Sequence, residues 1–348
     1  MSIAPLMVDI AGTSLTEDDI EILQHPFVGS LILFDRNLES PEQIQTLCAA
    51  IREVNHDLLI AIDQEGGRVQ RMQNGVTRLP PMRRFGELYD KDPEQARSLT
   101  EVCGWLMATE VLSVGIDFSF APVLDLDYET SEIIGHRAFH QDPEIAAELA
   151  LLFTHGMYNA GMAAVGKHFP GHGGVAPDSH IEIPVDDRSL EELKNDIYPF
   201  KKLIENDLPA IMPAHIIYSK IDELPAGFSK QWLQTILREQ LGFKGAIISD
   251  DLSMFGATVV GSIPKRVELA LDAGCDMVLI CNDRAAVLEA LENLPRNWQQ
   301  DNAKLHYLRG HGHMAYDILQ DNPNWQNAHK LIKDFNDGRD ELADNSNN

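Results

Sequence analysis

The sequence predicts a single-domain α/β protein folded as a closed (β/α)8 barrel of the TIM type, and three observations lead to this prediction. Eight short apolar runs are separated by longer stretches with helical periodicity. Several of the runs are unbroken, as expected of parallel strands buried on both faces. Each run is followed directly by polar or ionisable residues. Alternating strands and helices build right-handed βαβ units, and eight such units close into a barrel.

The elements follow in order along the chain. The predicted strands are residues 6–8, 29–34, 58–62, 116–124, 163–166, 209–212, 246–249 and 277–281. The predicted helices are residues 41–54, 93–114, 143–160, 190–206, 230–240 and 265–273. The first of these helices follows Ser40, a favourable N-cap residue. An open, doubly wound sheet is the alternative, but no G-x-G-x-x-G motif follows an early strand, so a dinucleotide-binding fold is disfavoured.

Two connections are unusually long, residues 63–93 and 166–189, and both are rich in glycine and proline. Long loops inside a compact domain are usually functional, so we expect them to border the site. We expect residues 1–295 to form the barrel domain. Residues 296–348 are expected to form a C-terminal helical segment that ends in a polar, frayed tail.

Composition excludes several classes of protein. The chain has 348 residues, of which 44% are hydrophobic and 24% charged, as in ordinary globular proteins. A formal net charge of −26 makes nucleic acids and anionic membrane surfaces poor partners. The four cysteines form no C-x-x-C pair and lie in apolar surroundings, which indicates reduced thiols in the core. Without a signal peptide or a long apolar span, the sequence predicts a cytoplasmic protein, with a monomer favoured.

Polar side chains follow all eight predicted strands. Chemistry in such barrels lies at the carboxyl ends of the strands, so these residues are expected to form one polar mouth. Three of them, Asp9, Asp35 and Asp283, are expected to be only helix N-caps. The others are Arg36, Asp63, Asp125, Asp127, Lys167, His168, His215, Asp250, Asp251 and Asn282.

The segment KHFPGHG at 167–173 continues to Asp178-Ser179-His180. Its glycines and prolines exclude a regular helix, so His168 and His172 do not share a helical face as zinc ligands would, and no metal is predicted here. An Asp-x-His pair on a loop suits acid/base work, because the carboxylate can hold the imidazole and raise its proton affinity. A loop-stabilising hydrogen bond between Asp178 and His180 is the alternative.

The segment DQEGGRVQR at 63–71 has glycines that let the backbone approach a ligand closely. Asp63 can accept hydrogen bonds from two sugar hydroxyls, and Arg71 can donate a guanidinium fork. Glu65 and Arg68 are expected to form a structural ion pair.

At these residues the sequence resembles glycoside hydrolase family 3, specifically its bacterial β-N-acetylglucosaminidases. The matching motifs span roughly residues 5 to 285 and are highly specific in combination. They are DQEGGRVQR at 63–71, GHRAF at 135–139, KHFPGHG at 167–173, Asp-Ser-His at 178–180 and SDDLSM at 249–254.

The resemblance implies a residue-by-residue assignment. Asp250 would be the nucleophile, whereas spacing alone does not choose between Asp250 and Asp251. His180 would be the general acid/base, supported by Asp178. The N-acetylglucosamine would be held by Asp63, Arg71, Arg137, Lys167 and His168, with His215 as a further site-lining candidate. The cationic members are expected to form a local positive island in an acidic protein.

The implied activity is exo-acting, retaining removal of N-acetylglucosamine from GlcNAc-1,6-anhydroMurNAc, with or without peptide, in peptidoglycan recycling. No cofactor is implied, and the partner is a small sugar substrate. Alternatives are a Schiff-base lyase using Lys167, a metal-dependent hydrolase using His311 and His313, a catalytically inactive sugar-binding protein, or phosphate as acceptor in place of water. A substrate-assisted route is disfavoured because Pro122 stands where a chitinase-like motif needs its first Asp.

Overall fold

The predicted barrel is confirmed in the computed structural model, which describes residues 3–131, 133–175, 184–294, 303–312 and 314–338. Eight parallel strands form one sheet in the order β6-β3-β2-β1-β12-β11-β9-β7. The strands are β1 (Leu6–Val8), β2 (Val28–Leu33), β3 (Leu59–Ile62), β6 (Phe118–Ser119), β7 (Val165–Phe169), β9 (Ala210–Pro213), β11 (Ala246–Asp251) and β12 (Met277–Leu279).

The sheet closes through the chain that follows β6. Phe118 and Ser119 pair with β3, but the next few residues pair with β7 instead. Leu124 donates its backbone N–H to the carbonyl oxygen of Lys167 at 2.6 Å, and the N–H of Val165 bonds the oxygen of Ala121 at 2.8 Å. The single run expected over 116–124 therefore changes neighbour halfway along. This shift places Asp125 directly beside the end of β7.

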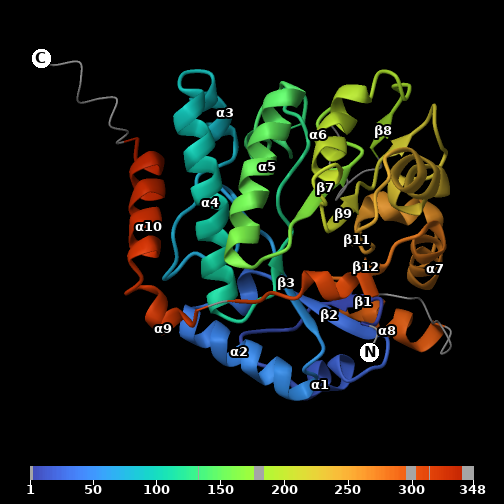
Figure 1. Ribbon diagram of the computed structural model, residues 1–348. Coiled ribbons are helices and arrows are strands. Elements are labelled where there is room, and N and C mark those ends of the chain that lie inside the picture. The colour runs from blue at the N-terminus through green and yellow to red at the C-terminus, as the bar shows by residue number, and fades with distance from the viewer. Residues whose placement is uncertain (1–2, 132, 176–183, 295–302, 313, 339–348) are drawn as a thin grey trace, which may run out of the picture.

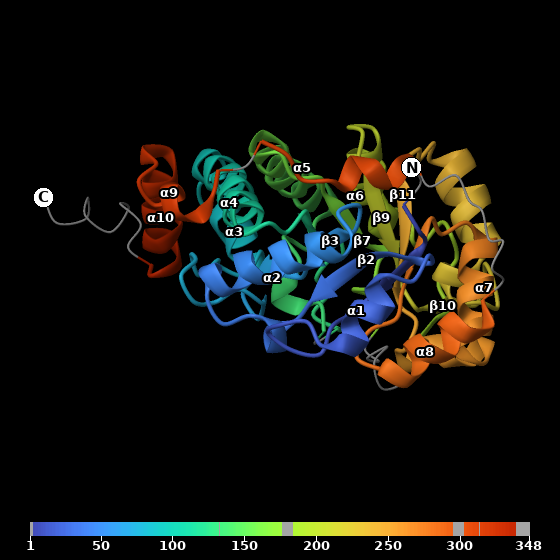
Figure 2. The same ribbon diagram turned by 90° about the horizontal axis from the view of Figure 1, so that it is seen from below.

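Helices follow the strands in turn and surround the sheet (Figures 1 and 2). Three of them, after β2, β3 and β6, begin with a side-chain N-cap and a proline at the first helical position, the most favourable order for a helix start. Two short helices, the first and last of the ring, were not predicted as elements. The ring comprises α1 (Glu17–Leu23), α2 (Pro41–Val54), α4 (Pro93–Ser113), α5 (Pro143–Ala160), α6 (Lys194–Ile204), the π-type helix η4 (Gln231–Gln240), α7 (Ile263–Ala273) and α8 (Arg284–Asn293).

The long connections contain small elements of their own. The first holds the antiparallel hairpin β4 (Gln64–Gly66) and β5 (Val69–Gln70), followed by the helix α3 (Arg83–Tyr89). The second ends in β8 (Val185–Asp186), which pairs in parallel with β10 (Ile217–Tyr218).

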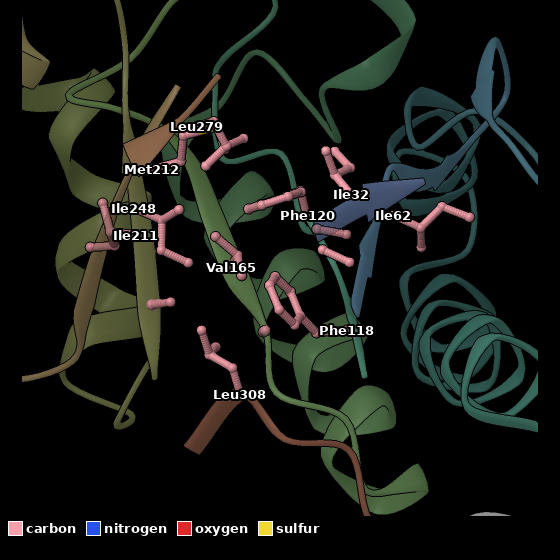
Figure 3. Packing of buried hydrophobic residues seen from close by; sticks show 14 of the residues in the cluster. Ile32, Ile62, Phe118, Phe120, Val165, Ile211, Met212, Ile248, Leu279 and Leu308 are labelled. Atoms are coloured by element: carbon pink, nitrogen blue, oxygen red, sulfur yellow. The ribbon is translucent and has the colours of Figure 1, made fainter. Parts of the chain in front are cut away.

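The amino ends of the strands are closed by the short helix η6 (Ala303–Leu308). Its Leu308 is fully buried and reaches the barrel interior beside Phe118 and Val165 (Figure 3). Arg309 then donates to the carbonyl oxygen of Leu58 at 2.9 Å, just ahead of β3. With this end sealed, the opposite end is the open one.

Two C-terminal helices, α9 (Tyr316–Leu319) and α10 (Pro323–Asn336), lie outside the ring beside α3 and α4 (Figure 1). The tail beyond residue 338 lies outside the described residues. The domain boundary at 295 stays a prediction.

All four cysteines are buried and free, as predicted. Among the described residues, no helix is both long enough and apolar enough to cross a bilayer.

Replacing Leu308 with alanine tests the seal at the amino end of the barrel. We expect Leu308→Ala to lower the free energy of unfolding by about 2–5 kcal/mol, because it leaves a cavity in the core. Urea denaturation measures the loss. The matched control is Leu288→Ala, which changes a half-exposed leucine of α8 and should cost less than about 0.5 kcal/mol. Equal losses in the two variants would contradict the role of Leu308.

Candidate active site

A cavity of about 390 Å³ opens at the carboxyl ends of the strands. Its volume lies within the roughly 300–1,000 Å³ of ordinary small-molecule pockets. Six residues predicted from the sequence line it together: Asp63, Arg71, Arg137, Lys167, His168 and Asp250. Only part of the predicted polar mouth lines this cavity. Its lining includes Asp63, Lys167, His168, Asp250, Asp251 and Asn282, but not Arg36, Asp125, Asp127 or His215.

The side chain of Lys167 lies at the base of this cavity, almost sealed from solvent. Its ammonium contacts Asp63 Oδ1 at 2.9 Å and Glu65 Oε1 at 2.6 Å. Burial pulls the pKa of Lys167 down, but the two carboxylates outweigh it and hold that pKa above its usual value. A Schiff-base lysine needs the opposite shift, so this environment disfavours the lyase alternative.

Glu65 joins Lys167 to Arg137. The Arg137 guanidinium donates through Nε and Nη2 to the two Glu65 oxygens, each at 2.8 Å. Although burial opposes ionisation, Arg137 and Lys167 keep the pKa of Glu65 well below its usual range. The expected Glu65–Arg68 ion pair was therefore wrong: Arg68 instead donates to the carbonyl oxygen of Ile133.

The expected positive island is also corrected by these contacts. Lys167 and Arg137 are both paired with carboxylates, Asp63 and Glu65, so the four charges balance within the cluster. An uncompensated pair of buried cations would cost several kcal/mol of desolvation, which the carboxylates offset. The site is a neutral charge network rather than a positive patch.

Asp125 organises the KHFPGHG segment. Its Oδ2 accepts from His168 Nδ1 at 2.7 Å, and its Oδ1 accepts the backbone N–H groups of His168 and His172 at 3.1 and 2.8 Å. With Nδ1 bound in this way, the Nε2 edge of the His168 ring is the one left for the cavity. Burial favours the neutral Asp125 carboxyl, but His168 outweighs it and lowers the pKa of Asp125.

His172 also lines the cavity, and sequence reasoning gave it no role. Burial, and next the neighbouring His168, lower its pKa, so the ring is neutral near pH 7. Its buried Nδ1 has no hydrogen-bond partner among the described residues. The second histidine of the motif was the signal that could have identified it.

Arg71 also lines the cavity and shares the Asp63 carboxylate with Lys167. Its Nη2 is 3.6 Å from Asp63 Oδ2 and its Nη1 is 3.4 Å from Asp35 Oδ2, both long for an ion pair. Its guanidinium also lies 5.7 Å from the centre of the Phe34 ring. Asp35, expected to be a helix N-cap, is instead the first residue of a short 3-10 turn whose N-cap is Phe34, and it contacts Arg71 from outside the cavity.

Two adjacent carboxylates, Asp250 and Asp251, end β11 and both border the cavity. Asp251 is held by its surroundings: it accepts from Ser253 N at 2.9 Å, Ser253 Oγ at 2.7 Å and Cys281 N at 3.1 Å. Burial nevertheless raises the pKa of Asp251 to about 7. Asp250 Oδ1 accepts the N–H of Asp251 at 2.8 Å, which fixes the orientation of its carboxylate.

His215 lies behind this strand end and is fully buried rather than lining the cavity. Its Nε2 is 3.1 Å from the carbonyl oxygen of Asp251, and its ring stacks on Phe228. Burial lowers its pKa, so it is a neutral donor to the backbone of β11. The structure therefore places His215 as a support of the Asp250–Asp251 backbone.

Asp127, predicted as part of the polar mouth, lies 3.5 Å from Arg83 through its Oδ2 and does not line the cavity. Asp283 caps α8 as expected, accepting from Ala286 N, while Asp9 accepts from Asn282 N and pairs with Arg36 across the strand ends. Asp178 and His180 lie outside the described residues, so their assigned roles stay predictions. His313, invoked for a metal site, also lies outside them.

The fold and the site are those of a barrel enzyme. Its cavity is large enough for a small sugar and is lined by two adjacent carboxylates, Asp250 and Asp251, in different environments. A family model for the N-terminal domain of glycosyl hydrolase family 3 matches residues 6–306. A β-hexosaminidase of Pseudomonas aeruginosa (strain LESB58) is 55% identical over 329 residues, covering 94% of this chain and 97% of that protein. One of Methylobacillus flagellatus is 51% identical over 332 residues, covering 94% and 95%.

A solved structure shows the same likeness. The crystal structure of NagZ from Neisseria gonorrhoeae in complex with N-trifluoroacetyl-D-glucosamine has a TM-score of 0.91 and 42% identity, covering 97% of this chain and 99% of that one. The chain belongs to glycoside hydrolase family 3, and its activity is that of a β-N-acetylhexosaminidase.

The buried charge network predicts a large effect of a single amide substitution. Glu65→Gln should lower the free energy of unfolding by about 3–5 kcal/mol, because it leaves Arg137 and Lys167 short of a counter-charge in a buried place. Urea denaturation at pH 7 measures this. The matched control is Glu94→Gln, which breaks an exposed 2.6 Å pair with Arg97 and should cost less than about 1 kcal/mol.

The pH dependence of the unfolding free energy tests the same charge network a second time. Because the folded-state pKa of Glu65 is depressed, its contribution is present above about pH 4.5 and is lost as the pH falls below that value. The difference in unfolding free energy between the wild type and Glu65→Gln should therefore become smaller in acid. A gap that widened below pH 4.5 would contradict the assignment.

Proposed function

We propose that this enzyme is an exo-acting, retaining β-N-acetylglucosaminidase that removes the non-reducing terminal N-acetylglucosamine from GlcNAc-1,6-anhydroMurNAc, with or without its peptide. The observation that carries the proposal is the placement of the Asp250 carboxylate on the same cavity as the Asp63–Lys167 pair. A reactive carboxylate and a set of hydroxyl ligands thereby face one space the size of a small sugar. We place the activity in peptidoglycan recycling in the cytoplasm, where the four free thiols would stay reduced.

Two observations support N-acetylglucosamine as the sugar that occupies the cavity. The NagZ relative from Neisseria gonorrhoeae was crystallised with N-trifluoroacetyl-D-glucosamine, a close analogue of this sugar. In this chain, Asp63 and Lys167 offer an acceptor and a donor side by side, 2.9 Å apart, an arrangement suited to adjacent sugar hydroxyls. His168 and Arg71 border the same space, and Arg137 holds Glu65 beneath it.

We assign the nucleophile to Asp250. Asp251 already accepts three hydrogen bonds from Ser253 and Cys281, and its pKa of about 7 leaves it partly protonated at neutral pH. Such a carboxyl group is both occupied and weakly nucleophilic. Asp250, whose carboxylate lines the cavity and is oriented by the N–H of Asp251, is the one we assign to attack the sugar.

The proposed reaction has two steps. In the first, an Asp250 oxygen bonds to the anomeric carbon while the bond to the leaving-group oxygen breaks, and that oxygen takes a proton from His180. In the second, water gives a proton to His180 and its oxygen displaces Asp250 from the anomeric carbon. Two displacements at one carbon retain the β configuration. A histidine in this role adds no second anion, and Asp178 would orient it.

The assignment of the nucleophile is tested by a matched pair of substitutions. Asp250→Asn should lower kcat by roughly 10⁴-fold or more on a chromogenic N-acetyl-β-glucosaminide, because the covalent step loses its nucleophile. Asp251→Asn keeps a carbonyl oxygen for the backbone N–H of Cys281 and should retain most of its activity. If Asp251→Asn were the inactive variant and Asp250→Asn the active one, the assignment would be reversed.

The covalent step can be trapped directly. A 2-deoxy-2-fluoro sugar with a good leaving group should form a stable adduct, and peptide mapping by mass spectrometry should find it on Asp250. The Asp250→Asn variant is the control and should remain unlabelled. A wild-type enzyme that stayed unlabelled, or an adduct on another residue, would count against the covalent mechanism and favour the substrate-assisted route.

Product analysis tests the substrate, the stereochemistry and the acceptor together. With the anhydro-disaccharide, NMR should first detect β-N-acetylglucosamine and anhydroMurNAc, since the reaction retains configuration. Added phosphate should leave the products unchanged if water is the acceptor. Initial release of the α-anomer would contradict retention, and a sugar phosphate would identify the phosphorolytic alternative.

A further inference from the structure

The C-terminal helices contact one part of the molecule repeatedly, the connection between β3 and α4, residues 63–92. Tyr316 of α9 donates its hydroxyl to the carbonyl oxygen of Gly75. In α10, Asn336 donates through Nδ2 to the carbonyl oxygen of Arg78 at 3.2 Å, and Phe335 packs on Phe85 with ring centres 5.1 Å apart. This connection also carries Asp63, Glu65 and Arg71, which border the cavity. The C-terminal helices therefore brace the segment that forms one wall of the site.

The strongest of these contacts is made to Glu110, a buried carboxyl group in the last turn of α4. It accepts the backbone N–H of Thr77 at 3.0 Å, the Thr77 hydroxyl at 2.6 Å and the indole N–H of Trp325 at 3.0 Å. Burial raises the pKa of Glu110 to about 7, and these three donors limit the rise. A buried carboxyl group is costly unless its donors are in place, so Thr77 and Trp325 are held where they are.

His329, one turn along α10, completes the contact. Because the Thr77 hydroxyl donates to Glu110, it accepts from His329 Nδ1, 2.7 Å away. The His329 ring also stacks on Trp325 with centres 4.9 Å apart. Thr77 is thus held from one side by α4 and from the other by α10.

A second buried side chain connects Thr77 to Arg71. Gln70 donates through Nε2 to the carbonyl oxygens of Thr77 and Met72, both at 2.9 Å. The backbone N–H of Met72 is held in turn by Gln64 Oε1 at 3.0 Å. The residues on both sides of Arg71 are therefore fixed by hydrogen bonds that lead back to Thr77.

The Arg71 side chain itself is held more loosely. Its contacts with Asp35 and Asp63 are 3.4 and 3.6 Å, at the long end for ion pairs, and its Nε has no hydrogen-bond partner among the described residues. The position of its guanidinium therefore depends mainly on where the backbone of residues 70–72 lies. A binding group that is not locked by its own contacts depends on supporting residues for its geometry.

We propose that Trp325, Glu110 and Thr77 are positioning residues for Arg71, so that the C-terminal helix α10 sets the affinity of the cavity for its sugar from outside the barrel. The inference rests on the proposed function, in which Arg71 contacts the sugar. None of the three residues lines the cavity. They act only through the placement of the loop that carries Arg71.

The test is a double-mutant cycle between Trp325→Phe and Arg71→Ala in the full chain. Trp325→Phe keeps an aromatic ring but removes the N–H that Glu110 accepts. It should raise KM for a chromogenic N-acetyl-β-glucosaminide, and the inhibition constant of free N-acetylglucosamine, by roughly 2- to 30-fold, with kcat little changed. In the Arg71→Ala background the same change should have no further effect on either constant.

The control is Trp105→Phe, an equal truncation on α4, whose indole takes no part in this network. It should leave KM and the inhibition constant unchanged. An undiminished effect of Trp325→Phe in the Arg71→Ala background would overturn the inference, because the loss would not pass through Arg71. An Arg71→Ala variant with normal affinity would overturn the proposed sugar contact and the inference with it.

A second pair of variants keeps the inference testable if Trp325→Phe folds poorly. Thr77→Val keeps the shape and the backbone N–H of Thr77 but loses the hydroxyl, whereas Thr77→Ser keeps the hydroxyl. Thr77→Val should raise KM and the inhibition constant, and Thr77→Ser should restore both to wild-type values. If the two variants had equal affinity at equal thermal stability, the hydroxyl would have no positioning role.

Discussion

The buried ammonium group of Lys167 is the constraint on which the site depends. A cation sealed at the base of the barrel mouth must be neutralised nearby, or desolvation would cost several kcal/mol. Asp63 and Glu65 supply the counter-charges from the end of β3, and Glu65 in turn requires Arg137 from the loop after β6. Three segments far apart in the chain are therefore held at fixed positions around one cavity. The groups that neutralise Lys167 are also groups that can bind a sugar.

At the end of β11, two neighbouring aspartates also have different structural roles because their environments differ. Asp251 is occupied by Ser253 and Cys281 and has a raised pKa, while Asp250 accepts the N–H of Asp251 and borders the cavity. His215 supports this backbone from behind. The large negative charge of the chain, −26, is not reflected in the Lys167 cluster, where two cations and two carboxylates balance. Affinity at this site must come from directed hydrogen bonds rather than from an overall electrostatic field.

The fold was largely predictable because buried strands and helices have recognisable apolar patterns in the sequence. Unbroken apolar runs identified the strands, and Ser40 with Pro41 identified the start of α2. Within residues 116–124 the chain changes its partner strand from β3 to β7, and this could not be predicted. An apolar run looks the same in the sequence whichever neighbouring strand it pairs with. Helix α1 was not predicted, because it has only seven residues, four of them acidic, and is too short to show a helical repeat of apolar residues. In the site, strand ends identified Asp63, Lys167 and Asp250. The partner of Glu65 was missed, since local spacing favoured Arg68, whereas the true partner, Arg137, lies 72 positions away.

A crystal structure of the Asp250→Asn variant with N-acetylglucosamine bound tests the central claim most directly. The sugar ring should lie in the cavity with its hydroxyls on Asp63, Lys167 and His168. Its anomeric carbon should face residue 250 and lie farther from Asp251. A sugar bound elsewhere, or one whose hydroxyls avoid the Asp63–Lys167 pair, would contradict the claim that the neutralised lysine cluster is the sugar-binding site.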